Sequence, residues 1–429
     1  MPDRRSIWLG LGLVALIGIA AFSFFRSPDQ RVDLADVPYQ PPEQITGQPE
    51  AVKGVSDIPG GQVVWAERTV TKIDEAGNNQ YHYRFLAADF TGLKQLIFAE
   101  ADDLQYEPIS IYGSDRLIIF DESGETARNR VLTLAGQTVD EFTPLYRTDG
   151  FLKSPDQKTL AYIGDAEPTE ADDSVSAKLV IRSVETGEER SLESSKFDSV
   201  DLKFSAYYLM AWSSDSRQLY LEVLVDPDEP SAGYALARID LADDSVDLMY
   251  VDNGNPDQIN PRELIGVYPG LGFALFQTVD YGSLDQTDSK VEALIERFDL
   301  STKSFTDWLK RDSVAVPISP FLDPLSPDGN HLILESQTED VQGLIIWNTQ
   351  TGELERLTER GSFLAWSPDS RFILFEILDE AETKGGYQLN SLEVSGQRQY
   401  QIYRQDVLSE GTGLNQVGDR FNQYIGVAW

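Results

Sequence analysis

The chain contains no cysteine among its 429 residues and only two histidines. The absence of cysteine excludes disulfides, thiolate metal sites and a cysteine nucleophile. His82 and His331 both lie in sequences typical of strands, and two histidines are too few for a histidine-ligated metal centre. There is also no Gly-x-Ser-x-Gly nucleophile motif. We therefore predict no catalytic residue, no cofactor-binding residue and no metal ligand.

Basic residues are scarce as well. The sequence has 35 lysines and arginines against 71 acidic residues, which gives a net charge of −36. A field of this sign repels nucleic acid and anionic lipid, so neither is an expected partner. It favours cations and basic proteins. The hydrophobic content of 41% is sufficient for a large packed core.

One long uncharged run stands near the N-terminus, from Ile7 to Phe25. A helix of this length nearly crosses a hydrocarbon core of roughly 30 Å. Arg4 and Arg5 precede the run, and this charge distribution favours a cytoplasmic N-terminus. We predict that residues 1–26 are a cytoplasmic end and a transmembrane signal-anchor, with a single-pass chain whose body is periplasmic or extracellular. The alternative is a cleaved signal peptide, with cleavage near Ala20.

Residues 27–58 are rich in proline and poor in large apolar side chains. Such a segment cannot bury enough surface to fold by itself, and its prolines keep it extended. We predict an extracytoplasmic linker that lifts the body, residues 59–429, off the membrane.

The body consists of short β-rich runs and repeats a hairpin seven times. The clearest copy is residues 345–357, in which an apolar strand, a Thr-Gly turn and an alternating strand follow one another. The seven turns lie at Gly92, Gly136, Gly187, Asp243–Ser245, Ser301–Lys303, Gly352 and Gly396. Their spacing fits one four-stranded unit each.

A second repeat is a Ser-Pro-Asp turn between two strands. It occurs with the aspartates Asp156, Asp215, Asp328 and Asp369. Proline presets the turn, and the aspartate can accept a backbone N–H two residues further on. We therefore interpret these acids as turn-forming residues and not as metal ligands.

These turns, each followed by a short apolar strand, resemble the WD40-like repeats of TolB-type β-propellers, which also occur in the propeller domains of prolyl-oligopeptidase relatives. The resemblance implies an all-β propeller and a role as a partner in envelope complexes. The seven hairpins give seven blades, with six or eight as alternatives. The fifth unit departs from the pattern, since Tyr268–Gly272 replaces its Ser-Pro-Asp turn.

The two ends of the body complement each other. The first hairpin lacks the strand that precedes the turn in other units, and Tyr424–Trp429 has the sequence of such a strand. We predict that the C-terminal strand completes the first blade and closes the ring, which removes an open sheet edge.

Acidic residues gather in the loops between the second and third strands of several units. The candidate partner-binding face contains Asp165, Glu167, Glu170, Asp172, Asp173, Asp226, Asp228, Glu229, Asp280, Asp285 and Asp288. One interpretation is a solvated surface that resists aggregation. The other is a docking face for a basic partner or for divalent cations such as Ca²⁺.

The function predicted from these features is a membrane-anchored binding or scaffold module of the cell envelope, without catalysis of its own. Its expected partner is an envelope or secreted protein, and a basic one fits the acidic face. Two alternatives stay open: an envelope hydrolase or lyase that uses loop carboxylates, and a Ca²⁺-stabilised structural surface protein.

Overall fold

The structure is a computed structural model of the whole chain. It describes residues 43–45, 52–53, 62–73, 79–91, 95–102, 106–112, 116–121, 128–133, 137–142, 151–165, 177–192, 204–225, 233–252, 262–280, 292–311, 315–317, 323–338, 341–359, 361–379, 386–395, 398–406 and 425–427. Among these residues no helix is long and apolar enough to span a membrane. The predicted signal-anchor, residues 1–26, lies outside them.

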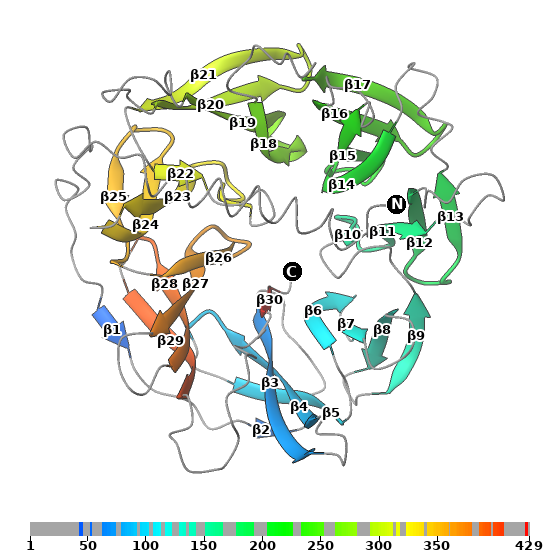
Figure 1. Cartoon of the computed structure of the whole chain (residues 1–429), viewed down its shortest axis with the longest axis vertical. Coiled ribbons are helices and arrows are strands. Elements are labelled where there is room, and N and C mark those ends of the chain that lie inside the picture. Colours follow the sequence, from blue (N-terminus) through cyan, green and yellow to red (C-terminus); the bar gives the residue numbers. More distant parts are fainter. Residues whose placement is uncertain are drawn as a thin grey trace, which may run out of the picture.

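The described strands form seven sheets arranged in a ring (Figure 1). We number the sheets as blades in chain order. The first blade contains β3 (Gln62–Ile73), β4 (Asn79–Asp89) and β5 (Gln95–Asp102); the second β6 (Tyr106–Tyr112), β7 (Arg116–Asp121), β8 (Arg128–Thr133) and β9 (Thr138–Phe142); the third β10 (Phe151–Lys153), β11 (Thr159–Asp165), β12 (Ala177–Ser183) and β13 (Glu189–Leu192).

The fourth blade contains β14 (Phe204–Trp212), β15 (Gln218–Val225), β16 (Gly233–Asp240) and β17 (Ser245–Val251); the fifth β18 (Arg262–Tyr268), β19 (Phe273–Asp280), β20 (Glu292–Asp299) and β21 (Ser304–Arg311); the sixth β22 (Ala315–Pro317), β23 (His331–Thr338), β24 (Val341–Asn348) and β25 (Leu354–Arg356); the seventh β26 (Ser362–Trp366), β27 (Phe372–Asp379), β28 (Gly386–Glu393) and β29 (Arg398–Asp406). The all-β propeller predicted from the sequence is confirmed.

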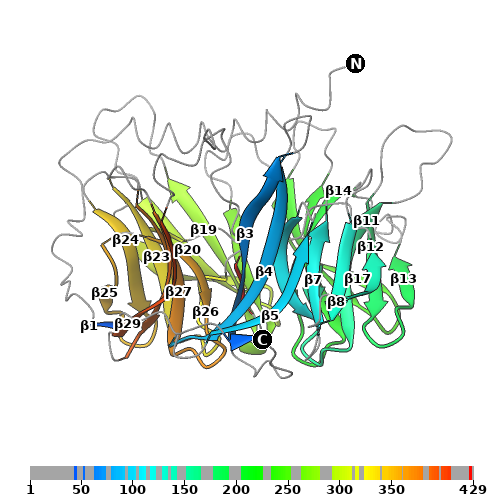
Figure 2. The same ribbon diagram turned by 90° about the horizontal axis from the view of Figure 1, so that it is seen from below.

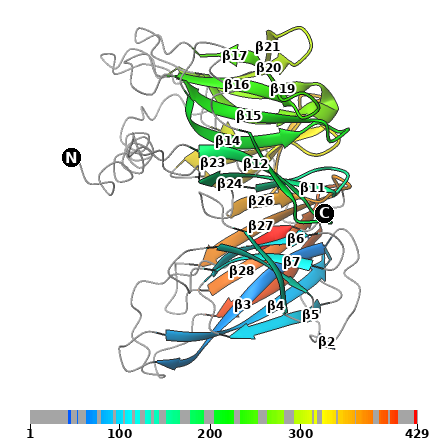
Figure 3. The ribbon, with the colours of Figure 1, turned by 90° about the vertical axis from the view of Figure 1, so that its right-hand side faces the viewer.

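Each blade is an antiparallel meander that runs outward from the axis, and its strands cross the disc between two faces (Figures 2 and 3). The first and third strands end at one face, which we call the turn face. The second strands end at the opposite face, which we call the loop face. A strand in such a ring is covered by neighbouring blades on both sides, so apolar residues occupy both of its faces.

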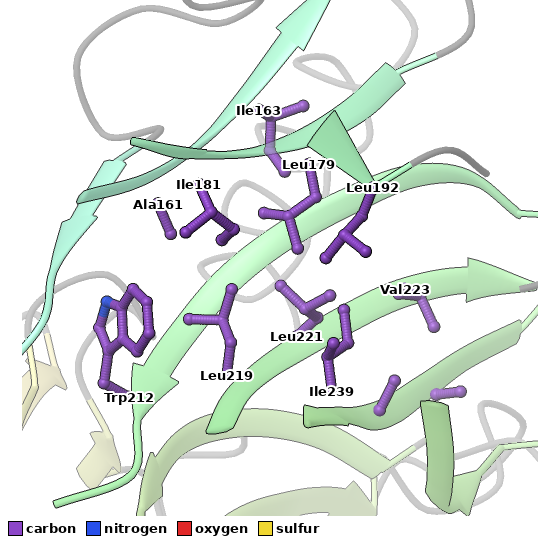
Figure 4. Close-up of a cluster of buried hydrophobic side chains, with 12 residues drawn as sticks. Ala161, Ile163, Leu179, Ile181, Leu192, Trp212, Leu219, Leu221, Val223 and Ile239 are labelled. Atoms are coloured by element: carbon purple, nitrogen blue, oxygen red, sulfur yellow. The ribbon is translucent and has the colours of Figure 1, made fainter. Parts of the chain in front are cut away.

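The core therefore lies between blades. Between the third and fourth blades, Leu179 and Ile181 pack against Leu219 and Leu221, with Trp212 beside them (Figure 4). Trp65, Trp212, Trp347 and Trp366 are all at least 93% buried, as expected for core residues. Trp429 lies outside the described residues.

The first blade is completed from the other end of the chain. β30 (Ile425–Val427) pairs antiparallel with β3, with Val63 opposite Val427 and Trp65 opposite Ile425. In Figure 1, β30 lies toward the centre of the ring. This is the closure predicted from the sequence.

The same junction, between the first and seventh blades, is also bridged on the outside. β1 (Glu43–Ile45) pairs parallel with β29 of the seventh blade, and β2 (Val52–Lys53) pairs parallel with β5 of the first. Glu43 also forms an ion pair with Arg398 at 3.5 Å. The described parts of the predicted linker thus lie against the propeller as edge strands and are not free of it.

The Ser-Pro-Asp turns have the predicted geometry. The Asp328 carboxylate accepts hydrogen bonds from the Ser326 hydroxyl at 2.6 Å and from the Asn330 N–H at 3.0 Å. Equivalent pairs of bonds form at Asp156, Asp215 and Asp369. In Asp156 these bonds, first from Ser154 and then from the backbone, lower the pKa of the carboxyl. The four aspartates are turn residues.

The turns also connect neighbouring blades. The Asp156 N–H donates to the Ser216 hydroxyl of the next blade, and the Asp328 N–H donates to the Ser370 hydroxyl, both at 3.1 Å. The hairpin turns are confirmed where the structure describes them, since Gly187, Asp244, Lys303 and Gly352 all have positive φ. Those at Gly92, Gly136 and Gly396 lie outside the described residues, although their flanking strands pair.

The fifth blade replaces the turn by a short 3-10 helix, Pro269–Leu271, which ends at Gly272 with φ of 80°. Leu271 packs on the turn of the sixth blade, where a Cβ on Gly329 would lie 2.8 Å from a Leu271 methyl carbon. The departure noted in the sequence is therefore an alternative turn that still contacts the next blade.

Candidate binding site between the fourth and fifth blades

The loops that carry the predicted acidic face begin on the loop face. Asp165 and Asp280 are the last residues of β11 and β19, paired in register with Ala177 and Glu292. The remaining nine predicted acids, Glu167, Glu170, Asp172, Asp173, Asp226, Asp228, Glu229, Asp285 and Asp288, lie outside the described residues. The acidic face therefore stays a prediction. The two described strand ends, at Asp165 and Asp280, lie at the loop face.

The described residues contain another acidic group beneath these loops. Glu222 lies on β15, three residues before the strand ends. Its cross-strand neighbours are Tyr208 on β14 and Leu236 on β16. Opposite residues in a sheet point to the same side, and Leu236 packs against the fifth blade. Glu222 therefore faces the fifth blade from within a mostly apolar sheet.

Two exposed tyrosines flank Glu222. Tyr208 lies directly opposite Glu222 on β14. On β16 the residue opposite Glu222 is Leu236, and Tyr234, two residues away, is therefore a diagonal neighbour of Glu222. Their exposed fractions are 42% and 46%. Among the described residues, only Val139 is a further large hydrophobic side chain with comparable exposure. Two of three such side chains thus lie beside one carboxyl group.

The fifth blade carries another carboxylate on its other side, because Glu263 lies opposite Gln277, and Gln277 shares its side of β19 with Leu275 in the core between the fifth and sixth blades. Glu263, the second residue of β18, accepts a hydrogen bond of 2.6 Å from the Gln277 amide nitrogen. Gln277 is only 7% exposed, and its carbonyl oxygen Oε1 has no hydrogen-bond partner among the described residues. A carboxylate only accepts hydrogen bonds, so the nitrogen must face Glu263 and the oxygen must be the free atom.

The neighbouring arginine is already paired. Arg262 forms a two-bond ion pair with Glu296, at 2.6 and 3.0 Å, and its guanidinium stacks 4.2 Å from the centre of the Phe305 ring. The Thr278 hydroxyl donates to the same carboxylate at 3.2 Å. The bond to Glu296 raises the pKa of Arg262. Within the part of the chain that the structure describes, neither Glu222 nor Glu263 forms an ion pair.

Burial controls the titration of Glu222. Burial, and secondly the charge of Glu263, raise the pKa of Glu222 to about 7. Burial also raises the pKa of Tyr234, with a further contribution from Glu222.

The group offers hydrogen-bond acceptors, negative charge and two aromatic rings, which suits a ligand with positive charge and several donors. Sequence analysis did not identify it. The one available signal was Glu222 within Gln218–Val225, where both strand faces are otherwise mostly apolar. Its neighbours could not be named without the register of three strands, β14, β15 and β16.

The histidines and metal ligands give no comparable group. His82 and His331 lie in β4 and β23, as predicted, and the His331 ring is tilted against Trp366 at 6.2 Å between centroids. In the described ranges no three His, Asp or Glu side chains are placed to hold a metal ion. The predicted absence of a metal or cofactor stays a prediction.

No protein-family model matches this sequence, and no curated protein matches it. Among solved structures, the chain is similar to a puromycin hydrolase, with 14% identity, a TM-score of 0.52, and coverage of 90% of this chain and 56% of that one. It is also similar to prolyl oligopeptidase B from Galerina marginata, with 11% identity, a TM-score of 0.50, and coverage of 81% and 52%. The chain thus spans about half the length of these two proteins.

TolB from Acinetobacter baumannii also matches, with 15% identity, a TM-score of 0.40, and coverage of 86% of this chain and 82% of that one. At these identities the comparisons concern the fold alone. The β-propeller fold implied by the Ser-Pro-Asp turns is confirmed.

Proposed function

We propose that this protein is a membrane-anchored, extracytoplasmic propeller that binds a protein partner of the cell envelope on its loop face and has no catalysis of its own. The observation that carries the proposal is the group formed by Tyr208, Glu222 and Tyr234. It combines two exposed aromatic side chains with a carboxyl group that forms no ion pair with the described residues. We call these three residues the Tyr–Glu site.

The scaffold supports this function. The Tyr–Glu site lies on strands and not on loops, and those strands are fixed by packing between blades. A rigid site loses little conformational freedom when a partner binds. The acidic loops predicted around it would add a long-range attraction for a basic partner and accelerate association.

The location in the envelope rests on the sequence. The uncharged run from Ile7 to Phe25 supports a single-pass anchor, and the arginines before it support an extracytoplasmic body. Fractionation and protease protection of tagged cells test this part. The expected result is a membrane-bound chain whose propeller is digested only when the outside face of the membrane is accessible.

Affinity capture tests the binding function. The full-length chain in detergent serves as bait for solubilised envelope proteins, and every captured protein is then purified and rebound to show direct contact. A Tyr208→Ala/Tyr234→Ala variant should lose the partner, whereas Val139→Ala, on the second blade, should retain it. A partner that binds all three baits equally would place the interface elsewhere, and failure of every bait would contradict the proposed function.

One observation favours a second candidate function. A carboxyl group whose pKa is raised by burial suits the role of a general acid in glycan cleavage. Glu222 would then be the general acid of an envelope hydrolase or lyase. Turnover of a glycan or peptide by the purified chain, lost in Glu222→Gln with unchanged thermal stability, would establish this activity instead.

A further inference from the structure

We propose that β1 and β2 are a second closure of the ring, which holds the first and seventh blades together from the outside, so that either these two strands or β30 alone keeps the ring closed. We call β1 and β2 together the strap, and the junction between the first and seventh blades the seam. The inference concerns the ring itself and does not depend on the binding function proposed above.

The seam is joined differently from the other junctions. Elsewhere the outer strand of one blade is followed in sequence by the inner strand of the next, as β13 is followed by β14. After β29 the chain instead supplies β30, which pairs with β3 over three residues, from Ile425 to Val427. A pairing of three residues has few hydrogen bonds, and such pairings open locally.

The seam also covers an apolar core. Phe90 of the first blade stacks on Phe372 of the seventh, with 5.9 Å between the ring centroids. Leu374 and Leu389 of the seventh blade belong to the same buried cluster. The Ser391 hydroxyl of the seventh blade donates to the Phe90 carbonyl. Separation of the two blades would expose these apolar side chains to water, so the ring is stable only while the seam is held shut.

The strap bridges the seam at the rim of the disc. β1 pairs with β29, the outer strand of the seventh meander, and β2 pairs with β5, the outer strand of the first. Ile45 and Val52, the facing ends of β1 and β2, are seven residues apart in sequence. At no more than about 3.6 Å per residue, this stretch restrains the two pairings to within about 25 Å of each other.

The two closures act at opposite ends of the seam. β30 lies toward the centre of the ring, whereas β1 and β2 lie on its outside (Figure 1). Blades that separate at the rim pivot about β30 and break the strap pairings, and blades that separate at the centre pivot about the strap and break the β30 pairing. Complete separation requires both. While one closure is formed, it keeps the partners of the other at a high effective concentration, which favours their pairing again.

Backbone pairing holds the strap in place. β1 and β2 contain three and two residues. The ion pair between Glu43 and Arg398, at 3.5 Å, joins side chains that are 70% and 53% exposed, so it adds little stability. Removing backbone N–H groups should therefore release the strap, whereas shortening its side chains should not.

Variants that break one closure or both test the inference. Gln44→Pro/Ile45→Pro/Val52→Pro/Lys53→Pro removes the N–H groups of the strap, whichever of them face the partner strands. Alanine at the same four positions is the matched control, because it retains those groups. Deletion of residues 424–429 removes β30. Hydrogen exchange and thermal melting of the full-length chain in detergent are compared with those of each variant and of the two closures broken together.

The informative strands are β4 and β28, which lie inside their sheets and pair with neither closure. Each single change should accelerate their exchange less than about threefold and the combined change at least about tenfold, with β15 and β19 unaffected. The loss of melting temperature in the combined variant should exceed the sum of the single losses, because each closure substitutes for the other. The alanine control should match the unaltered chain. Additive losses, or equal acceleration in every blade, would overturn the inference.

A disulfide gives an independent test, because the chain has no cysteine of its own. Gln44 and Gln399 are directly opposite each other on β1 and β29, so Gln44→Cys/Gln399→Cys places two thiols within reach. Oxidation should raise the melting temperature of the chain without residues 424–429 at least about twice as much as that of the chain with β30, since a general effect of the cross-link would be equal in both. Reduction should abolish the gain, and Gln399→Cys alone should show none. Equal gains in both chains, or a disulfide that forms between two copies, would overturn the inference.

Discussion

The indole N–H of Trp366 donates to the backbone carbonyl of Pro324 on the preceding blade at 3.0 Å. The same relationship exists one half-turn of the ring away, where Trp212 donates to Leu152 at 3.2 Å. In both cases the acceptor lies two residues before the serine of one turn, and the donor lies directly before the serine of the next. One repeated motif thus joins the third blade to the fourth and the sixth to the seventh.

Replacing either donor should therefore destabilise its own junction. We expect Trp366→Phe and Trp212→Phe each to lower the free energy of unfolding by about 1–2 kcal/mol, because one hydrogen bond to a backbone carbonyl is lost and the smaller ring leaves a gap. Urea denaturation of the full-length chain in detergent measures this. The two junctions are far apart, so the losses should add in the double variant. A single loss as large as the double would show that one junction controls the whole ring.

The turn residue after each Ser-Pro-Asp aspartate gives a matched pair of variants. Gln157 and Gly329 both have positive φ, 60° and 74°, but only glycine adopts it without cost. We expect Gln157→Gly to raise the free energy of unfolding by about 0.5 kcal/mol and the melting temperature slightly. Gly329→Ala should lower the free energy of unfolding by about 1–2 kcal/mol, because of both the positive φ and the close approach of Leu271. If the two variants shift the melting temperature in the same direction, backbone strain at this position is not the controlling factor.

Glu222 should make stability depend on pH. Its pKa is raised from an ordinary value of 4.5 to about 7 in the folded chain, so the folded state binds the extra proton between these values. Stability from this group is present below about pH 4.5 and is lost as pH rises through 7. Glu222→Gln, which does not titrate, should thus be more stable than the unaltered chain above pH 7, by on the order of 2 kcal/mol.

Denaturation series at pH 5, 6, 7 and 8 measure the difference between the two proteins. Glu263→Gln is the matched control, because it removes the neighbouring charge and should move the transition of Glu222 to lower pH. A stability difference that does not change between pH 5 and pH 8 would contradict the raised pKa.

The closing strand can be tested by truncation. Without residues 424–429, β3 of the first blade has an unpaired inner edge, because β30 no longer pairs with Val63, Val64 and Trp65. We expect a lower melting temperature and self-association through the open edge. Light scattering coupled to size-exclusion chromatography detects the association. A truncated chain that stays monomeric and melts like the full-length chain would show that β30 is dispensable.

The sequence was sufficient for those features that repeat. The Ser-Pro-Asp turns, the hairpins and the complementary ends each carry local turn chemistry or a strand pattern, and these predict the propeller and its closure. The Tyr–Glu site could not be predicted because Tyr208, Glu222 and Tyr234 lie on three different strands of the fourth blade. Only the register brings them together.

The outer strands β1 and β2 were missed for a different reason. They contain three and two residues within a proline-rich segment, too few to show an alternating pattern. Their partners β29 and β5 are edge strands, which accept a further strand through backbone groups alone. Composition therefore predicted a linker where the backbone forms short parallel pairs.

The junction between the first and seventh blades also sets an order of events during synthesis. About 360 residues separate Val63 on β3 from Val427 on β30. At translation rates of roughly 5–20 residues per second, the first blade waits on the order of 20–70 s for its inner strand. Throughout that interval six other blades can form, while the blade made earliest keeps an edge open. The outer pairings of β2 with β5 form within a much shorter stretch of chain, so they are available to hold the first blade in place until the ring closes.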